Sequence, residues 1–284
     1  MIQPFFNKSH ILNCRGKLFD LSEPKIMAII NITPDSFYNK SRFTNNNDIT
    51  TQVNNIIENG GEIIDVGAYS SRPGANFIDE NEEWNRLEPT LELIRKINSD
   101  IIISVDTFRS EIAKKSVKEF EVDIINDISA GNLDSNMFNT IAELNVPYII
   151  MHMQGTPQNM QDNPTYKNIL QDIFLFFAKK IEQLNQLGVS DIIIDPGFGF
   201  GKTIEHNYEL LSRLDEFRIL ELPLLVGLSR KSMICNTLDI TPEEALNGTS
   251  VLNTLALKSG ANILRVHDVK EAVELKKLFK KTYN

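Results

Sequence analysis

The sequence joins a short apolar run to an acidic residue and a glycine-rich segment in the stretch Ile192-Ile193-Ile194-Asp195-Pro196-Gly197-Phe198-Gly199-Phe200-Gly201-Lys202. A short apolar run followed by polar or glycine-bearing residues occurs eight times along the chain, and each run is typical of a buried strand. Nearly every run is followed by an amphipathic stretch of helical length. The eight runs are residues 26–30, 63–66, 101–105, 122–125, 148–151, 192–194, 224–226 and 263–264.

Eight strand–helix units in succession predict an α/β fold, a TIM (β/α)8 barrel of parallel strands. In such a barrel the loops after the strands share one mouth, so residues far apart in the sequence meet in one site. The length of 284 residues is typical of this fold. No linker or shift in composition divides the chain, so we expect a single domain over residues 1–284. Residues 1–24 precede the first strand, and we expect them to form a short hairpin or cap at the bottom of the barrel.

Composition disfavours several classes of protein. Apolar residues make up 42% of the chain, enough for a large core, and the formal net charge of −9 argues against broad nucleic-acid binding. Cys14 and Cys235 lie far apart without metal-type spacing, which favours a reduced, cytoplasmic protein. The chain shows no signal pattern and no apolar run near membrane-spanning length, so no membrane partner is expected.

Two long polar stretches, residues 33–48 and 67–79, are too irregular for regular elements and are typical of lids or binding loops. Two helices are predicted more clearly. Apolar residues at helical spacing run from residue 169 to 187 and end at Gly188. A second helix is predicted over residues 241–259, opened by a capping box of Thr241 and Glu244.

Polar side chains follow the predicted strands and should gather at the mouth of the barrel, where catalysis occurs in this fold. They are Asn31, Asp65, Asp106, Asn126, Met151-His152, Asp195, Ser229-Arg230-Lys231 and Arg265-Val266-His267.

Several of these residues also have a purely structural interpretation. Asp106 could cap the helix that follows it, and Asn126-Asp127 could shape a turn. Asp65 could brace the loop that carries Arg72, and for His152 taken alone a hydrogen-bonded structural role is favoured. A set composed only of caps and turns is disfavoured, because eight strand ends carry such residues.

The chemistry of the set indicates its ligand. Asp106, Asn126 and Asp195 offer acceptors and one amide, which suits a flat heterocycle with adjacent N–H donors. Lys231 supplies a point charge for a ring carbonyl or an anion. Arg265 and His267 are two residues apart on an extended segment, so both can face the mouth and hold a phosphate-type group.

The segment Gly197–Thr203 is similar to a phosphate-binding P-loop but is one residue short of the required spacing. We therefore interpret it as a loop that presents Phe200, and not as an ATP site.

Eight motifs occur in an order that spans nearly the whole chain. They are Asn31-Ile32-Thr33-Pro34-Asp35-Ser36-Phe37, Ser71-Arg72-Pro73-Gly74, Asp106-Thr107, Asn126-Asp127-Ile128, Met151-His152-Met153-Gln154-Gly155, the stretch from Asp195 to Lys202, Gly227-Leu228-Ser229-Arg230-Lys231-Ser232 and Arg265-Val266-His267-Asp268. Together they resemble the dihydropteroate synthases, the sulfonamide-target enzymes of folate synthesis. The resemblance implies condensation of 6-hydroxymethyl-7,8-dihydropterin diphosphate with p-aminobenzoate, giving dihydropteroate and pyrophosphate.

The resemblance also implies a role for individual residues. Those that bind the pterin would be Asp106, Asn126, Asp195 and Lys231, with Ile128, Met151 and Gly227 as further substrate-binding residues. Arg265 would stack on the pterin and, with His267 and Asn31, hold the diphosphate and its Mg²⁺, for which Asn31 is the expected metal ligand. The p-aminobenzoate site would be framed by Ser71, Arg72, Pro73, Phe200, Lys231 and Ser232. Asp35 and Phe37 would lie on a second loop that closes over the reacting centre. The residues expected to act in catalysis are Asp35, Asp106, Asp195, Lys231, Arg265 and His267.

The sequence departs from the family at Ser71, where threonine is usual, so the hydroxyl is retained and one methyl contact is lost. A homodimer is expected from the resemblance, through helices remote from the mouth such as residues 241–259.

Three other functions were weighed. A corrinoid-dependent methyltransferase would share Asp106, Asn126 and Asp195 but has no need for the Arg265/His267 pair. An aldolase with Lys231 as a Schiff base is disfavoured, because Lys231 lies in a loop between two polar residues. A noncatalytic pterin-binding protein is disfavoured because the diphosphate-binding and loop residues are all present.

Overall fold

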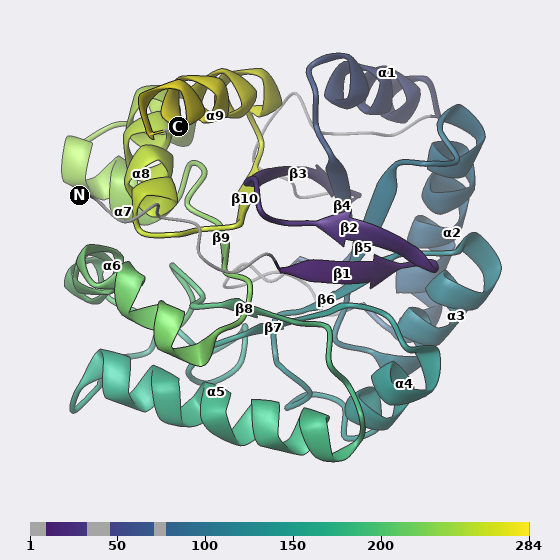
Figure 1. The fold of residues 1–284 in the computed structure, drawn as a ribbon, viewed down its shortest axis with the longest axis horizontal. Helices are drawn as coiled ribbons and strands as arrows, with labels where there is room; N and C mark the ends of the chain where they lie inside the picture. The colour runs from purple at the N-terminus through teal and green to yellow at the C-terminus, as the bar shows by residue number, and fades with distance from the viewer. Residues whose placement is uncertain (1–9, 33–45, 71–77, 284) are drawn as a thin grey trace.

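The computed structural model describes residues 10–32, 46–70 and 78–283. Its centre is a sheet of eight parallel strands in the order β8-β7-β6-β5-β4-β3-β10-β9 (Figure 1). The two outermost strands meet through a parallel bridge between Ile194 and Leu224, and the amide of Ile194 donates to the carbonyl of Pro223 at 3.0 Å. The sheet is thus nearly closed, and the predicted TIM-type barrel is confirmed. The strands are β3 (Lys25–Asn31), β4 (Ile63–Gly67), β5 (Ile102–Asp106), β6 (Ile124–Asp127), β7 (Tyr148–Met151), β8 (Ile192–Asp195), β9 (Leu225–Val226) and β10 (Ile263–Val266).

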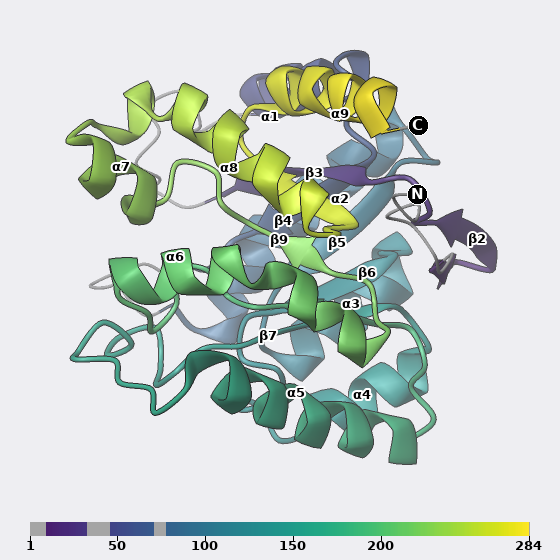
Figure 2. The ribbon, with the colours of Figure 1, turned by 60° about the vertical axis from the view of Figure 1, so that its left-hand side comes forward.

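Helices surround the barrel on its outer face (Figures 1 and 2). They are α1 (Asn46–Glu58), α2 (Glu80–Ile97), α3 (Ser110–Phe120), α4 (Met137–Leu144), α5 (Ile169–Gln186), α6 (Ile204–Ser212), η1 (Leu214–Leu220), α7 (Ser232–Leu238), η2 (Pro242–Glu244), α8 (Leu246–Lys258) and α9 (Val269–Tyr283). The helix predicted to end at Gly188 is α5, whose Asn168 caps the amide of Gln171 at 3.1 Å. No helix in the described part of the chain is both long and apolar enough to cross a membrane.

The helix predicted over residues 241–259 is divided in two, and in this respect the prediction was wrong. The capping box of Thr241 and Glu244 is present, but it opens the short 3-10 turn η2. Helix α8 begins only after Ala245, whose ψ of 8° lies outside the helical range.

The inside of the barrel changes from apolar to polar along the strands. Its lower layer is apolar and consists of Met27, Ile63, Ile124, Ile149, Ile193, Leu225 and Ile263. Strand side chains alternate between the two faces of a sheet, so the residues two positions further along also point inward. Four of them are Asp65, Asn126, Asp195 and Arg265. The alternation therefore directs charged and amide groups into the mouth above an apolar floor.

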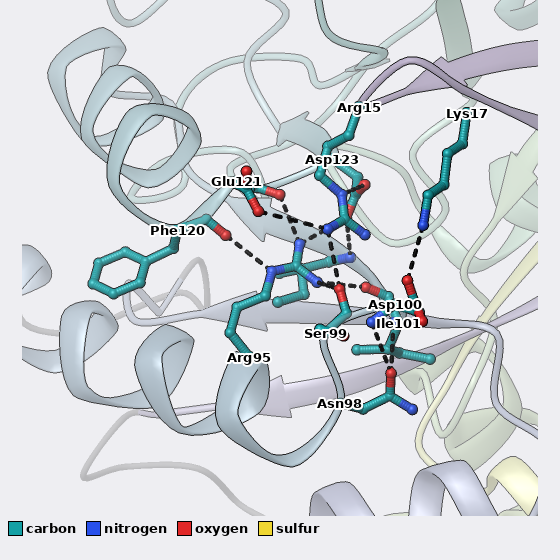
Figure 3. Close-up of polar contacts among 11 residues, drawn as sticks. Arg15, Lys17, Arg95, Asn98, Ser99, Asp100, Ile101, Phe120, Glu121 and Asp123 are labelled. Atoms are coloured by element: carbon teal, nitrogen blue, oxygen red, sulfur yellow. Dashed lines mark hydrogen bonds and ion pairs between the residues drawn. The ribbon is translucent and has the colours of Figure 1, made fainter.

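A two-stranded hairpin, β1 (Ile11–Cys14) and β2 (Lys17–Asp20), lies at the opposite end of the barrel from the mouth. It lies in front of the strands in Figure 1 and on the right in Figure 2. Its buried residues Leu12 and Cys14 pack into the apolar floor. The buried carboxylate of Asp123 accepts hydrogen bonds from Arg15 Nε at 2.6 Å and Arg95 Nη2 at 2.9 Å, which ties the hairpin to the barrel (Figure 3).

Candidate active site

Strand pairing places Asn31, Gly67 and Asp106 side by side on three neighbouring strands at the mouth. The Asn31 Oδ1 atom is 3.6 Å, and the Asp106 Oδ2 atom 3.7 Å, from the point where a Cβ on Gly67 would stand. An amide oxygen and a carboxylate oxygen therefore approach one position beside a glycine, where no side chain separates them.

Arg265 reaches across the barrel to two carboxylates. Its Nε and Nη2 atoms lie 2.7 and 2.6 Å from Asp65 Oδ2, and Nη2 also lies 2.9 Å from Asp106 Oδ2. Asp65 is fully buried, and Ser104 Oγ donates to its other oxygen at 2.6 Å. These contacts fix the plane of the guanidinium group at the floor of the mouth.

Burial raises the pKa of Asp106 to about 7, an effect that the nearby Arg265 opposes and that Asp65 reinforces. Asp106 is thus balanced between its neutral and charged forms near neutral pH. Such a shift is common at functional sites, because the same burial that binds a ligand also disfavours charge.

Asn126 lies beside this pair, and its Nδ2 atom donates to Asp65 Oδ2 at 3.2 Å. The neighbouring Asp127 is the residue that shapes the turn, accepting from the amides of Ser129 and Gly131, both at 2.7 Å. The turn is therefore shaped by Asp127, and the Asn126 side chain lies with the groups of the mouth.

Asp195 and Lys231 lie on the opposite side of the mouth. Asp195 Oδ1 accepts the amide of Gly197 at 2.7 Å, and burial raises the pKa of its carboxyl group while Lys231 opposes the rise. Burial lowers the pKa of Lys231 to about 8, opposed by Asp195. The Lys231 ammonium donates to the carbonyl of Phe198 and lies 4.9 Å from the centre of the Phe200 ring. Gly227 leaves room beside it, with Lys231 Nζ 3.9 Å from the point where its Cβ would stand.

His267 is held by Ser229, a strand-end residue to which the sequence assigned no role. The Ser229 Oγ atom is 3.2 Å from the backbone amide of His267 and 3.0 Å from its Nδ1 atom. The hydroxyl can donate to Nδ1 or accept from it, and in the tautomer in which it donates, the proton of a neutral imidazole is on Nε2. Ser232, at the first position of α7, is exposed.

An apolar cluster adjoins the polar groups. It contains the predicted residues Ile128, Met151 and Phe200, together with Phe108, Met153 and Met160, which the sequence did not single out. Met153 is two positions beyond Met151, and that period-2 spacing is the one signal that could have indicated it. Flat heterocycles bind between such apolar walls and a few polar groups.

The contacts of Asp106 and Asp65 bear on the structural roles that the sequence suggested for them. Asp106 caps no helix, because α3 has Arg109 at its N-cap position. The suggestion that Asp65 braces the loop carrying Arg72 falls outside the described residues, among which Asp65 binds Ser104, Asn126 and Arg265.

His152 has the structural role that was favoured for it alone. It is buried, it packs edge-on against Phe176 at 5.0 Å, and burial lowers its pKa to about 2. Arg230 also turns away from the mouth, to a paired contact with Asp268 at 2.7 and 2.9 Å.

Five predicted site residues lie outside the described residues. They are Asp35, Phe37, Ser71, Arg72 and Pro73.

A magnesium ion fits the donor set beside Gly67, because hard divalent cations prefer oxygen ligands such as that of Asn31. Within residues 10–32, 46–70 and 78–283, no group of three or more His, Cys, Asp or Glu side chains could hold a metal ion.

Known proteins are similar to this chain in sequence and fold. A family model described as "Pterin binding enzyme" matches residues 27–267. The dihydropteroate synthase of Escherichia coli (strain K12) is 41% identical over 273 residues, which cover 95% of this chain and 96% of that protein. The Yersinia pestis dihydropteroate synthase, solved with a sulfonamide drug complex, has a TM-score of 0.92 at 38% identity and covers 96% of this chain and 99% of its own. The Xanthomonas albilineans dihydropteroate synthase with 4-aminobenzoic acid has a TM-score of 0.88 at 32% identity, over 97% of this chain and 98% of its own. The chain belongs to the dihydropteroate synthases, a family of pterin-binding enzymes.

Proposed function

We propose that this chain condenses 6-hydroxymethyl-7,8-dihydropterin diphosphate with p-aminobenzoate, as a transferase of folate biosynthesis, at the mouth described above. The observation that carries the proposal is the convergence of Asp106, Asn126, Asp195, Lys231 and Arg265 over an apolar floor. Carboxylate and amide oxygens match the N–H edge of a pterin, and Lys231 matches its ring carbonyl.

The diphosphate binds at the side of the mouth formed by Asn31, Arg265 and His267. The Nε2–H of a neutral His267 is a donor for a phosphate oxygen, and the position of Arg265 supports ion pairing with the same group. Asn31 would be a protein ligand for Mg²⁺, which when bound would neutralise part of the charge on the leaving diphosphate.

The p-aminobenzoate site lies next to Phe200, with Lys231 and Ser232, and Ser71, Arg72 and Pro73 complete it from the loop at residues 71–77. The position of the Lys231 ammonium, 4.9 Å from the centre of the Phe200 ring, supports this assignment. The Xanthomonas relative solved with 4-aminobenzoic acid supports it as well.

The chemistry follows from the placement of charge. Departure of the diphosphate leaves positive charge on the exocyclic methylene of the pterin, which the carboxylates of Asp106 and Asp195 stabilise. Arg265 and His267 bind the departing diphosphate and stabilise its negative charge. The arylamine then attacks from a fixed position, so proximity supplies much of the rate and no covalent protein intermediate forms. Asp35 and Phe37, which lie outside the described residues, are part of the proposal as further groups that act at this centre.

A homodimer formed through α8 is part of the proposal. Val251 and Leu255 on this helix are 52% and 45% exposed, which supports an apolar contact with a second copy. Both cysteines are unpaired and buried, in keeping with a reducing, cytoplasmic compartment.

The test is pyrophosphate release on mixing the protein with dihydropterin diphosphate, Mg²⁺ and p-aminobenzoate, with the product identified by mass. We expect dihydropteroate in equal amount to pyrophosphate, and no turnover without p-aminobenzoate. The variant Lys231→Met should lose turnover. Tight binding of the pterin diphosphate without turnover in the parent protein would instead indicate a binding protein.

A further inference from the structure

Lys202 closes the glycine-rich motif, and its side chain turns away from the mouth. It is 3% exposed and lies beneath the loop of residues 196–201. A lysine after a glycine-rich loop suggests phosphate binding, but here the ammonium is enclosed by protein acceptors. Neither the pterin nor the p-aminobenzoate site proposed above uses it.

The Lys202 ammonium connects two parts of the loop to the segment that follows β7. Its Nζ atom lies 2.9 Å from the Gly197 carbonyl and 3.0 Å from the Phe200 carbonyl. It also lies 3.0 Å from Nδ1 and 3.3 Å from the carbonyl oxygen of His152. Burial lowers the pKa of Lys202 to about 7, and in the charged form its three protons are all used by these acceptors.

The surroundings of His152 keep its ring neutral, so that Nδ1 can accept a hydrogen bond. Burial, and next the charge of Lys202, lower the pKa of this imidazole to about 2, so it stays neutral and its Nδ1 atom can accept.

The loop of residues 196–201 packs closely against the segment after β7, so its position depends on the contacts of Lys202. Gly197 has φ of +73°, and a Cβ on it would stand 2.0 Å from the His152 carbonyl oxygen. The loop backbone therefore lies directly against the segment that Lys202 binds, and loss of the ammonium would leave several carbonyls facing one another without a donor.

We infer that Lys202 is a positioning residue for p-aminobenzoate, because it fixes the carbonyl of Phe200 and thereby the aromatic wall of that site. The inference rests on the proposed role of Phe200. The pterin should be affected less, since the Asp195 carbonyl in β8 accepts the His152 amide at 3.0 Å, and the charges of Lys231 and Arg265 act on its carboxyl group more strongly than that of Lys202.

The test compares Lys202→Met with Leu184→Ala, a variant in the buried core of α5 that lowers stability without touching the loop. A hydrogen bond from a charged donor typically contributes about 10- to 100-fold to an equilibrium. We expect Lys202→Met to raise the KM for p-aminobenzoate at least about tenfold, while the dissociation constant of the pterin diphosphate changes less than about threefold. Leu184→Ala should leave both values near those of the parent protein.

A folded Lys202→Met variant whose two constants stay unchanged, or change in equal proportion, would overturn the inference. If this variant does not fold, Lys202→Gln offers two N–H donors to four acceptors, so the KM for p-aminobenzoate should still rise, and an unchanged value would overturn the inference. Phe200→Ala separates the two claims. If Phe200→Ala leaves the KM for p-aminobenzoate unchanged, the proposed role of Phe200 is refuted. If Phe200→Ala raises this KM but Lys202→Met does not, only the inference about Lys202 is refuted.

Discussion

Asp65 is the buried carboxylate on which the position of Arg265 depends, and Asp65→Asn tests that dependence. The change keeps the size of the side chain but removes its charge. One oxygen can still face Arg265, whose Nε and Nη2 atoms now lie 2.7 and 2.6 Å from Asp65 Oδ2. The new amide group then faces the Ser104 hydroxyl, which can turn to accept, while Asn126 Nδ2 keeps its contact with the remaining oxygen, 3.2 Å in the parent protein.

The size of the expected effect depends on the contacts that Arg265 keeps in Asp65→Asn. Leaving a buried charge without its partner costs about 3–5 kcal/mol. Arg265 keeps Asp106 at 2.9 Å and its side chain is 21% exposed, so we expect Asp65→Asn to lower the free energy of unfolding by about 2–3 kcal/mol. A displaced guanidinium would also bind the diphosphate poorly. A misplacement of about 1 Å in an active site can cost about 100-fold, so kcat/KM for the pterin diphosphate should fall about 10- to 100-fold.

The assay combines urea denaturation with steady-state pyrophosphate release at varied pterin diphosphate. Ser104→Ala is the matched control, since it removes one hydrogen bond to Asp65 and leaves the ion pair intact. It should cost about 1 kcal/mol of stability and little activity. Equal losses of kcat/KM in both variants, or none in Asp65→Asn, would refute the role given to this carboxylate.

Three further predictions concern single positions. Gly197→Ala should abolish most activity, because its Cβ would stand 2.0 Å from the His152 carbonyl oxygen. Gly16→Ala is the control, with φ of +75° and nothing within 4 Å of the added Cβ, and it should lower the free energy of unfolding in thermal or urea denaturation by only about 1–2 kcal/mol. Equal effects of the two variants would contradict this prediction. Arg15→Met should lower stability by about 1–3 kcal/mol without changing either KM, since it removes one charged partner of a buried carboxylate far from the mouth. Burial raises the pKa of Asp106 to about 7, so the folded state holds this proton more tightly than the unfolded chain. The stability from this group is complete below about pH 4 and is lost as the pH rises through 7. As the pH rises from 4 to 8, the urea concentration at the unfolding midpoint should therefore fall more in the parent protein than in Asp106→Asn. An equal fall in the two proteins would contradict the raised pKa of Asp106.

Much of the fold followed from local patterns. Each apolar run became a strand of the barrel, because a strand buried on both faces needs continuous apolar residues. The ends of the strands were less certain. The run at residues 122–125 was predicted as a strand, whereas β6 covers Ile124–Asp127. Asp123, inside the predicted run, is fully buried and is bound by Arg15 and Arg95, two partners that local sequence does not reveal.

The site was predictable where it depended on alternation along one strand. The two-residue spacing of Arg265 and His267 predicted that both would face the mouth, and both lie there. The partners across the barrel were not predictable. Asp65 and Arg265 are 200 positions apart, and only closure of the sheet brings them together. The direction of Lys202 depends on the positive φ of Gly197, which residue spacing does not reveal.

The most direct test of the proposed site is a crystal structure of the protein with dihydropterin diphosphate and Mg²⁺. We predict that the pterin ring lies at the mouth with its N–H edge on Asp106, Asn126 and Asp195. The diphosphate should lie against Arg265 and His267. A pterin bound elsewhere, or a diphosphate held by the glycine-rich loop, would contradict the assignment of the site.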